Sequence, residues 1–479
     1  MGSTRRVVLL SGLTAAATRI AATPTEAVSS ARTQDTTPPG LDREIRFDEA
    51  ARAAAAEDFG HILRKMPKGV LQPNSASDVA ATIRWAGKRG LKFVAQGQRH
   101  SVFGRSMAHD GIAADLSRLQ TIHSVKANLA VVDAGATWSE VLAATLPLGL
   151  TPPVLTDYLG LSIGGTLTVG GIGGRTPRFG FQSDNVVSME VVTGTGREVI
   201  CSANANADLF DSVRAGLGQV AVITRVTLKL IAAPPLVRRY LLSYPDLNAM
   251  LHDQRLLAHD NRFDVVLGAI VPGPGGSWLF RLDATKGLTN GQADDVGLLT
   301  GLADNPANRQ ASTQTYFEYL NRLATLEKTL RSNGQWFLPH PWLATFIGDS
   351  NVEAVVGREL ARMGPADLGT FGQVVLSAFW RKPVTTPLLR LPSDELCYAF
   401  NLVRIPTAGG ATEIGRLLQE NRLVHTRVRD AGGTLYPVSA FPMRRDDWRQ
   451  HFGAAFGSLS DAKRKFDPHN VLTPGYEIF

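Results

Sequence analysis

The order of hydrophobic and polar residues between positions 70 and 95 predicts a helix between two short strands. A first extended piece ends at Leu71-Gln72-Pro73. Ser75 can cap the helix, because Asp78 follows three residues later. Apolar residues then recur along one helical face up to Gly90, which ends the helix. Residues 91–95 form an apolar run typical of a buried strand.

The rest of the chain divides into two regions of different pattern. Strand-like patterns recur up to residue 232, at 112–116, 130–135, 186–192 and 220–230. They do not alternate regularly with helices as in a Rossmann domain, so this region is predicted to be a mixed α+β unit. After Pro234-Pro235 longer helical patterns appear, at 244–258, 315–330 and 411–430, which indicates a second domain.

The composition is that of a globular protein of two or three domains, with 479 residues, 44% of them hydrophobic and 19% charged. The net charge is +7, but no basic stripe with interleaved aromatic residues is present, so nucleic acid is not expected as a partner. No apolar run of about 18 residues follows the N-terminal segment, so no membrane span is expected. Cys201 and Cys397 lack metal-site spacing; we expect no metal and two buried thiols, with a distant disulfide as the alternative.

Residues 1–42 are expected to direct the protein to its location. Arg5-Arg6 precedes a short apolar stretch, and small residues continue to Thr25-Glu26-Ala27, where cleavage is expected. The arginine pair resembles a twin-arginine signal, which would export the protein, already folded, from a bacterial cell. The alternative is an unstructured tail with no signal. Residues 28–42 have the composition of a linker.

Residues 161–174 read Leu-Ser-Ile-Gly-Gly-Thr-Leu-Thr-Val-Gly-Gly-Ile-Gly-Gly. Glycines permit positive φ and let the backbone approach a ligand closely. The spacing is neither the G-x-G-x-x-G of nicotinamide-binding domains nor a phosphate loop that ends in Lys-Ser/Thr. Backbone N–H groups here could still hold a pyrophosphate, and a plain loop is the alternative.

The most informative segment is Gln96-Gly97-Gln98-Arg99-His100-Ser101-Val102-Phe103-Gly104, a loop after a buried strand. Taken alone, a histidine in such a loop is more often a surface or hydrogen-bonding residue than a catalytic one. The segment resembles the His-Ser attachment loop of FAD-linked oxidases of the vanillyl-alcohol oxidase superfamily, in which the histidine is bonded to the flavin. The Gly-rich stretch contains no cysteine, so a single covalent link is expected.

The resemblance covers nearly all the chain after residue 60 and is greatest to the cytokinin dehydrogenases. The matching segments, in order, are 138–142, 156–159, 162–167, 208–210, 216–219, 339–343 and 466–469. Each is weak alone, but their order and spacing are specific. The resemblance implies the two-domain, PCMH-type FAD-binding fold of class α+β. Its FAD-binding domain would span 43–235 and be completed by 440–479, with a substrate domain of sheet and helices at 236–439.

The resemblance also implies roles for individual residues. His100 would carry FAD covalently, and Asp157 would accept the substrate's proton, a role that needs a carboxylate near the flavin and screened from water. The other expected flavin contacts are Ala95, Gly97, Gln98, Arg99, Ser101, Arg105, Ser162, Thr168, Ile172, Ile223 and Tyr476. A turn or cap residue is the alternative interpretation of Asp157. His340, between two prolines, is expected to be structural.

Three positions depart from the family. Leu267 stands where the family has a Glu that binds the adenine-like part of cytokinin, while Arg105 and Tyr476 each replace a Gln. A site that loses a hydrogen-bonding group loses discrimination for its ligand, so we expect a substrate other than cytokinin.

The expected activity is oxidation of a small organic molecule, an amine or secondary metabolite, by hydride transfer to the flavin. Dioxygen or a quinone would be the electron acceptor. The alternatives are a cytokinin dehydrogenase, an alcohol or sugar oxidase, and a flavin-bearing protein that sequesters a compound without turnover.

Overall fold

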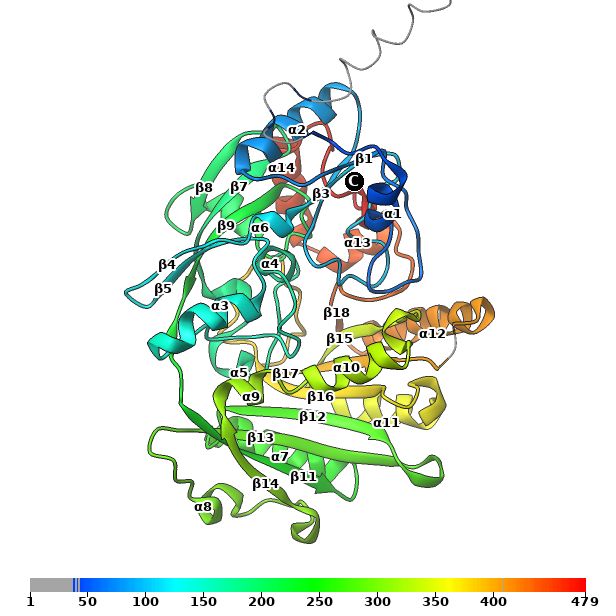
Figure 1. Cartoon of the computed structure of the whole chain (residues 1–479). Helices are drawn as coiled ribbons and strands as arrows, with labels where there is room; N and C mark the ends of the chain where they lie inside the picture. Colours follow the sequence, from blue (N-terminus) through cyan, green and yellow to red (C-terminus); the bar gives the residue numbers. More distant parts are fainter. Residues whose placement is uncertain (1–37, 39–40, 42–43, 408) are drawn as a thin grey trace, which may run out of the picture. The chain divides into compact units, whose positions relative to one another are not determined.

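A computed structural model describes residues 38, 41, 44–407 and 409–479 of the chain. Within these residues the chain forms four β-sheets with helices packed against them (Figure 1). The predicted export signal and its cleavage site lie outside these residues, as does nearly all of the predicted linker. No helix of the described ranges combines the length and the apolar character that a membrane crossing needs.

The first half of the chain forms a three-stranded and a five-stranded sheet. The parallel three-stranded sheet has the order β1-β3-β2, with β1 at Gly69–Leu71, β2 at Phe93–Gln96 and β3 at Ile112–Asp115. The antiparallel five-stranded sheet has the order β4-β5-β9-β7-β8, with bounds Ile122–Lys126, Leu129–Asp133, Ala221–Lys229, Val186–Thr193 and Glu198–Ser202. A pair of two-residue strands, β6 (Leu150–Thr151) and β10 (Ile231–Ala232), lies apart from these two sheets.

Two of the helices of this half begin at capping side chains. In α2 (Ala76–Lys88) the Ser75 side chain accepts a hydrogen bond from the Asp78 N–H at 3.2 Å, as the sequence predicted. In α3 (Trp138–Thr145), Thr137 and Glu140 form a complete capping box. The Gly-rich stretch, for which a plain loop was one of two interpretations, contains a short helix, α4 (Ile163–Leu167). The sequence pattern had not indicated β8 or α6 (Ala207–Val213).

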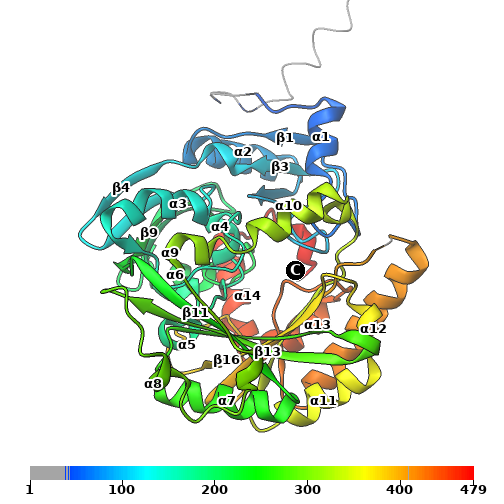
Figure 2. The same ribbon diagram turned by 60° about the horizontal axis from the view of Figure 1, so that its bottom comes forward.

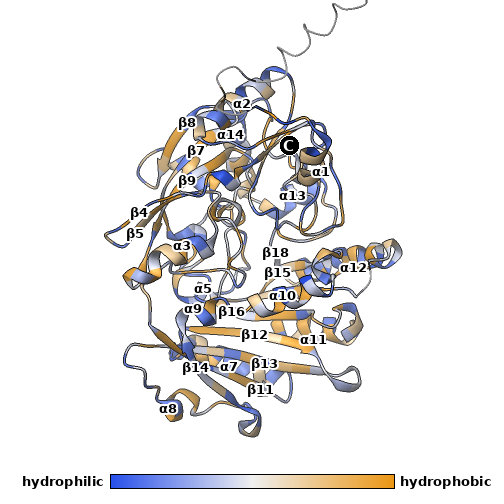
Figure 3. Cartoon of the chain, in the orientation of Figure 1, coloured by the Kyte–Doolittle hydropathy of each residue, from blue (hydrophilic) through white to orange (hydrophobic). Residues whose placement is uncertain are grey.

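The second half of the chain forms an antiparallel eight-stranded sheet. Its order is β14-β11-β13-β12-β16-β17-β15-β18, with bounds Gln310–Thr315, Leu236–Tyr244, Trp278–Leu288, Val265–Pro272, Gln373–Trp380, Leu396–Val403, Leu343–Gly348 and Thr434–Leu435. Three helices lie along one face, α7 (Leu247–Asp260), α11 (Val352–Arg362) and α12 (Ala411–Asp430) (Figure 2). α12 carries hydrophobic and hydrophilic residues in alternating patches, because only its inner side packs on the sheet (Figure 3).

The predicted helix at 315–330 is two helices, α9 (Tyr316–Leu320) and α10 (Ala324–Ser332). Thr315 and Glu318 form a capping box at the start of α9. Residues 321–323 separate the two helices. One of them is Arg322, whose guanidinium lies near the carboxylates of Asp157 and Asp283.

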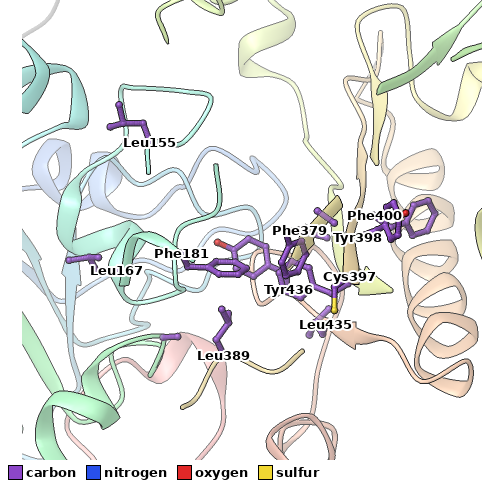
Figure 4. Packing of buried hydrophobic residues seen from close by; sticks show 14 of the residues in the cluster. Leu155, Leu167, Phe181, Phe379, Leu389, Cys397, Tyr398, Phe400, Leu435 and Tyr436 are labelled. Carbon is purple, nitrogen blue, oxygen red and sulfur yellow. The ribbon is translucent and has the colours of Figure 1, made fainter. Parts of the chain in front are cut away.

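An aromatic cluster fixes the Gly-rich stretch to the eight-stranded sheet (Figure 4). The Phe181 ring lies 5.6 Å from that of Phe379 and 5.8 Å from that of Phe346, in edge-to-face arrangements. Tyr436 lies beside Phe346, and its hydroxyl oxygen accepts a hydrogen bond from the Gly171 N–H at 3.2 Å.

The C-terminal segment returns to the three-stranded sheet. After α13 (Arg445–Phe452) and α14 (Ala455–Phe466), Leu472 pairs with Phe93 of β2 in parallel. The buried Asp467 accepts hydrogen bonds from Lys463 and from the N–H groups of Val471 and Leu472. Both cysteines are buried free thiols, the first of the two arrangements expected for them.

Candidate functional site

A cavity with about 1150 Å³ of empty space lies beside the end of β2, α4 and the start of β9. Part of this space is open to solvent. All the predicted flavin contacts line it except Ile172, namely Ala95, Gly97, Gln98, Arg99, His100, Ser101, Arg105, Ser162, Thr168, Ile223 and Tyr476. Pro437 and Val438, which follow the eight-stranded sheet, also contribute to its wall.

Backbone N–H groups form one wall of the cavity. The peptide N–H groups of residues 97–101 have no acceptor in the part of the chain that the structure describes, and all five residues line the cavity. Arg99 has φ of +52°, a left-handed turn that lets successive N–H groups converge. Gly97 packs so tightly on Ser162 that a Cβ there would overlap the Ser162 hydroxyl. Such a cradle fits the pyrophosphate of a dinucleotide cofactor.

His100 is clamped between aromatic rings at the edge of this cavity. Its imidazole stacks on Phe59 at a centroid distance of 3.9 Å and on Tyr158 at 5.1 Å. Burial lowers the pKa of His100 to about 3, and the nearby His340 and the positive charge of Arg331 act in the same direction. The ring is therefore neutral near pH 7 and keeps a lone pair available for bonding.

Asp58 holds the loop that carries His100. Its carboxylate accepts hydrogen bonds from the Ser101 hydroxyl at 2.8 Å and from the N–H groups of Gly104 at 2.7 Å and Gly60 at 3.1 Å. Burial raises the pKa of Asp58 to about 6, against the opposite effect of these hydrogen bonds and of Arg105. Three hydrogen bonds to one buried carboxylate restrict the movement of the loop.

His340 has the structural position predicted for it. Its ring is fully buried and stacks on the face of Phe59 opposite His100, at 4.1 Å. Its Nδ1–H donates to the Phe59 carbonyl at 3.0 Å, because a carbonyl oxygen can only accept. Burial lowers the pKa of His340 to about 4, so this ring too is neutral at pH 7.

Asp157 lies outside the lining of the large cavity. It borders a smaller pocket with Tyr158 and α10, and its side chain is 44% exposed. Arg322 donates a hydrogen bond to it at 2.5 Å. On the other side of Arg322, Asp283 lies at 4.0 Å and accepts a bidentate pair of hydrogen bonds from Arg239. Asp157 is thus the end of a chain of alternating charges.

Leu267 and Asp283 occupy the same face of the eight-stranded sheet. They are directly opposite in the register of β12 and β13, so their side chains are neighbours. A Cβ on Gly174 would come within 3.6 Å of Leu267, so this face is turned toward the Gly-rich stretch. The position where the family has a Glu therefore carries an apolar side chain next to a carboxylate already paired with Arg239.

The sequence did not reveal Asp58, Phe59, Asp283 or Arg322. Asp58 and Phe59 lie in an irregular segment, with no periodicity or motif to mark them. The sequence feature that marks this segment is Gly60. A Cβ at this position would overlap the backbone of Val102 in the histidine loop. Asp283 and Arg322 act through contacts between segments distant in sequence.

Two family models match the chain. One, described as FAD binding domain, matches residues 67–202, and the other, described as Cytokinin dehydrogenase 1, FAD and cytokinin binding, matches residues 288–479. Together they include His100, Ser162 and the C-terminal Tyr476.

Relatives match over almost the whole chain. An uncharacterized oxidoreductase of the fasciation locus of Rhodococcoides fascians is 38% identical over 90% of this chain and 98% of its own. Cytokinin dehydrogenase 10 of Oryza sativa subsp. japonica is 33% identical over 91% of this chain and 88% of its own. The crystal structure of 6-hydroxy-D-nicotine oxidase from Arthrobacter nicotinovorans covers 92% of this chain and 99% of its own, with a TM-score of 0.73 and 21% identity. The two-domain FAD-binding fold expected from the sequence is confirmed.

Proposed function

The chain belongs to the cytokinin dehydrogenase family of FAD-linked oxidoreductases, and on that premise we propose that it carries FAD covalently on His100 and oxidises a small organic substrate at a C–N bond. The resemblance stated from the motifs is thereby confirmed at the level of the family. The covalent link, the substrate and the site of action go beyond that level and are the content of the proposal.

The position and charge state of His100 support the covalent link. The imidazole lies at the edge of the cavity, beside the N–H groups of residues 97–101, which have no acceptor among the described residues and suit a pyrophosphate. It is fixed by Phe59 and Tyr158, and with its pKa lowered to about 3 it is a neutral nucleophile. Other residues of the same loop would hold the phosphates, so loop and link act together.

When bound, FAD supplies the oxidising chemistry by taking a hydride from a carbon of the substrate. Asp157 accepts the proton from the neighbouring heteroatom, and Arg322 keeps this carboxylate in place. Because Asp157 borders a smaller pocket and not the large cavity, the substrate has to extend from the cavity toward α10. Dioxygen or a quinone serves as the final electron acceptor.

The substrate is proposed to be an amine or a nitrogen-containing secondary metabolite. Relatives at 33% identity are named cytokinin dehydrogenases, which supports a nitrogen-containing substrate. Leu267 argues against cytokinin itself, since the neighbouring Asp283 is paired with Arg239 and is not free to replace the missing carboxylate. With Arg5-Arg6 as a twin-arginine signal, the enzyme would act outside the bacterial cytoplasm.

The covalent link is tested by acid precipitation of the purified protein. The wild-type pellet should remain yellow, whereas His100→Ala should release its flavin into the supernatant. His340→Ala is the matched control, because this buried histidine stacks on the other face of Phe59 and does not line the cavity. Release of flavin from the wild-type protein would show that the link is absent.

The substrate class is tested by anaerobic bleaching of the flavin with a panel of amines, alcohols and sugars that includes isopentenyladenine. Bleaching by amines and not by isopentenyladenine is expected. Bleaching by isopentenyladenine would establish a cytokinin dehydrogenase, and bleaching by alcohols or sugars alone would refute action on a C–N bond. Tight binding of an amine without bleaching would identify it as sequestered and not oxidised.

A further inference from the structure

A row of side chains crosses four neighbouring strands of the eight-stranded sheet. Ala269 of β12 lies directly opposite Val375 of β16. Asn401 of β17 lies between Val375 and Ala344 of β15, opposite both of them. The row is on the same face as Leu267, which is turned toward the Gly-rich stretch, because residues two apart on a strand share a face. The four side chains therefore form one line across the middle of the sheet.

Most of this row is not covered by other parts of the described chain. Ala269, Val375 and Asn401 are partly exposed, although each of their strands has a neighbouring strand on both sides. Two residues away on β16 and β17, Ser377 and Ala399 are on the same face and are buried. The sheet face is thus closed beside the aromatic cluster and open at the row.

The inner end of the row adjoins the wall of the large cavity. The Ala344 N–H donates to the Ser439 hydroxyl, and the Ala344 carbonyl accepts from the Tyr436 N–H, both at 2.9 Å. The two residues between Tyr436 and Ser439 line the cavity. Asn401 is one strand away from Ala344, a spacing of about 4.8 Å. A molecule that extends from the cavity over the sheet therefore meets Asn401.

Asn401 presents hydrogen-bond donors on this open face. Its Oδ1 accepts a hydrogen bond from the Thr345 N–H at 3.2 Å, and only the oxygen of a carboxamide can accept. The backbone therefore fixes the orientation of the carboxamide, and its NH₂ group has no acceptor among the described residues. Gln373, two residues before Val375 on the same face, has no such anchor and can turn either end toward a ligand.

The neighbouring charged groups do not supply a free acceptor. Arg281 lies opposite Ala269 at the outer end of the row, and a guanidinium can only donate. Asp283, two residues further along the strand of Arg281, accepts a bidentate pair of hydrogen bonds from Arg239. The polar groups at both ends of the row are thus donors, with Ala269 and Val375 between them.

We infer that Asn401 donates a hydrogen bond to the substrate and selects molecules that present an acceptor there, a carbonyl oxygen or a ring nitrogen on a flat apolar body. A ligand that places an N–H group at this point would set donor against donor and leave both unpaired. The inference deepens the proposed function and rests on it only in placing the flavin beside this row. It concerns binding and requires no turnover, so it can fail while oxidation at a C–N bond stands.

The test titrates the flavin-loaded protein with three flat probes of similar shape, followed by flavin absorbance and by calorimetry. Acetophenone presents a carbonyl oxygen, α-methylstyrene has a CH₂ group in its place, and benzamidinium presents N–H donors. The wild-type protein should bind acetophenone roughly tenfold more tightly than either of the others, because these leave the Asn401 NH₂ group unpaired. α-Methylstyrene is the more apolar molecule, so burial alone would favour it over acetophenone.

Two substitutions at Asn401 separate its donor from its structural contact. Asn401→Asp keeps an oxygen for the Thr345 N–H and exchanges the donor for an acceptor. It should bind benzamidinium roughly tenfold more tightly than acetophenone, the reverse of the wild-type order. Asn401→Ala removes the donor, so acetophenone and α-methylstyrene should differ by no more than roughly twofold.

Asn305→Ala is the matched control. The Asn305 Oδ1 also accepts a backbone N–H, that of Ala307 at 3.1 Å, but this residue does not line the cavity. The control should keep the wild-type order of the probes. Equal binding of acetophenone and α-methylstyrene by the wild-type protein, or no binding of acetophenone up to its solubility limit, would overturn the inference. The wild-type order in both Asn401 variants would overturn it as well. The expected order together with oxidation of no amine would instead refute the proposed function and leave the role of Asn401 in place.

Discussion

The histidine loop and the surroundings of Asp157 differ in the chemical groups that form them. The loop at 96–106 presents peptide N–H groups to the cavity and is fixed from behind by the buried carboxylate of Asp58. Around Asp157, by contrast, the groups are charged side chains, Arg322, Asp283 and Arg239, which reach one another from separate segments.

In the function proposed above, the first region binds the cofactor and the second selects the substrate. A backbone cradle depends on glycines and on tight packing, and it binds through peptide N–H groups that nearly every residue carries. A network of charged side chains changes its specificity when one member changes, which is the effect proposed for Leu267 where the resemblance implies a Glu. The two regions should therefore respond differently to substitution.

The largest effect is expected at Gly97, where the cradle meets the Gly-rich stretch. A Cβ in Gly97→Ala would overlap the Ser162 hydroxyl and push the N–H groups out of place. Overpacking of this kind costs about 1–3 kcal/mol, so flavin content per polypeptide should fall roughly tenfold. The flavin absorbance of purified protein measures this directly.

A second substitution sharpens the test of the cradle. Ser162→Gly removes the overlapping atoms, so the double variant Gly97→Ala/Ser162→Gly should regain flavin. Gly90→Ala is the control: unlike Gly97, Gly90 has positive φ, at +66°, and a Cβ there meets no atom within 4 Å. It should lower stability without a loss of flavin. A double variant as empty as Gly97→Ala would argue against packing as the cause.

The next effect is the pH dependence given by Asp58. Its pKa is raised to about 6 in the folded protein and is about 3.9 in an unfolded chain, so the folded state prefers the protonated form. Stability contributed by this preference is present below pH 4 and is lost as the pH rises through 6, by about 3 kcal/mol. Denaturant unfolding of wild type and Asp58→Asn should therefore show a difference that changes between pH 4 and pH 7. An equal difference at both pH values would contradict the raised pKa.

The two regions also differ in how well the sequence predicted them, because one depends on contiguous residues and the other on contacts between distant segments. The histidine loop was assigned to the flavin through the resemblance of a contiguous segment that contains Gly97, His100 and Ser101, whereas the residues alone pointed to N–H groups at 161–174. Asp58 escaped because its function arises mainly from hydrogen bonds donated by Ser101 and Gly104, which lie 43 and 46 positions away. The strands of the eight-stranded sheet also escaped, since their pairing depends on partners far apart in the chain. At Asp157 the sequence suggested a carboxylate but not Arg322, which lies 165 residues further on.

The smallest effect is expected at the Asp157–Arg322 pair, and it decides whether the charges beside Asp157 act as a network. Arg322 is 13% exposed and Asp157 44%, so solvent screens part of their attraction. A double-mutant cycle with Arg322→Gln and Asp157→Asn should give a coupling energy of about 1 kcal/mol in denaturant unfolding. The Arg464–Asp461 pair, with exposures of 73% and 69%, is the control and should give a coupling near zero. Arg322→Gln alone should cost more than Asp157→Asn alone, because Asp283 also loses a neighbouring positive charge. If both pairs couple equally weakly, the charges around Asp157 are independent surface groups, and substrate selection would have to come from the apolar face at Leu267 instead.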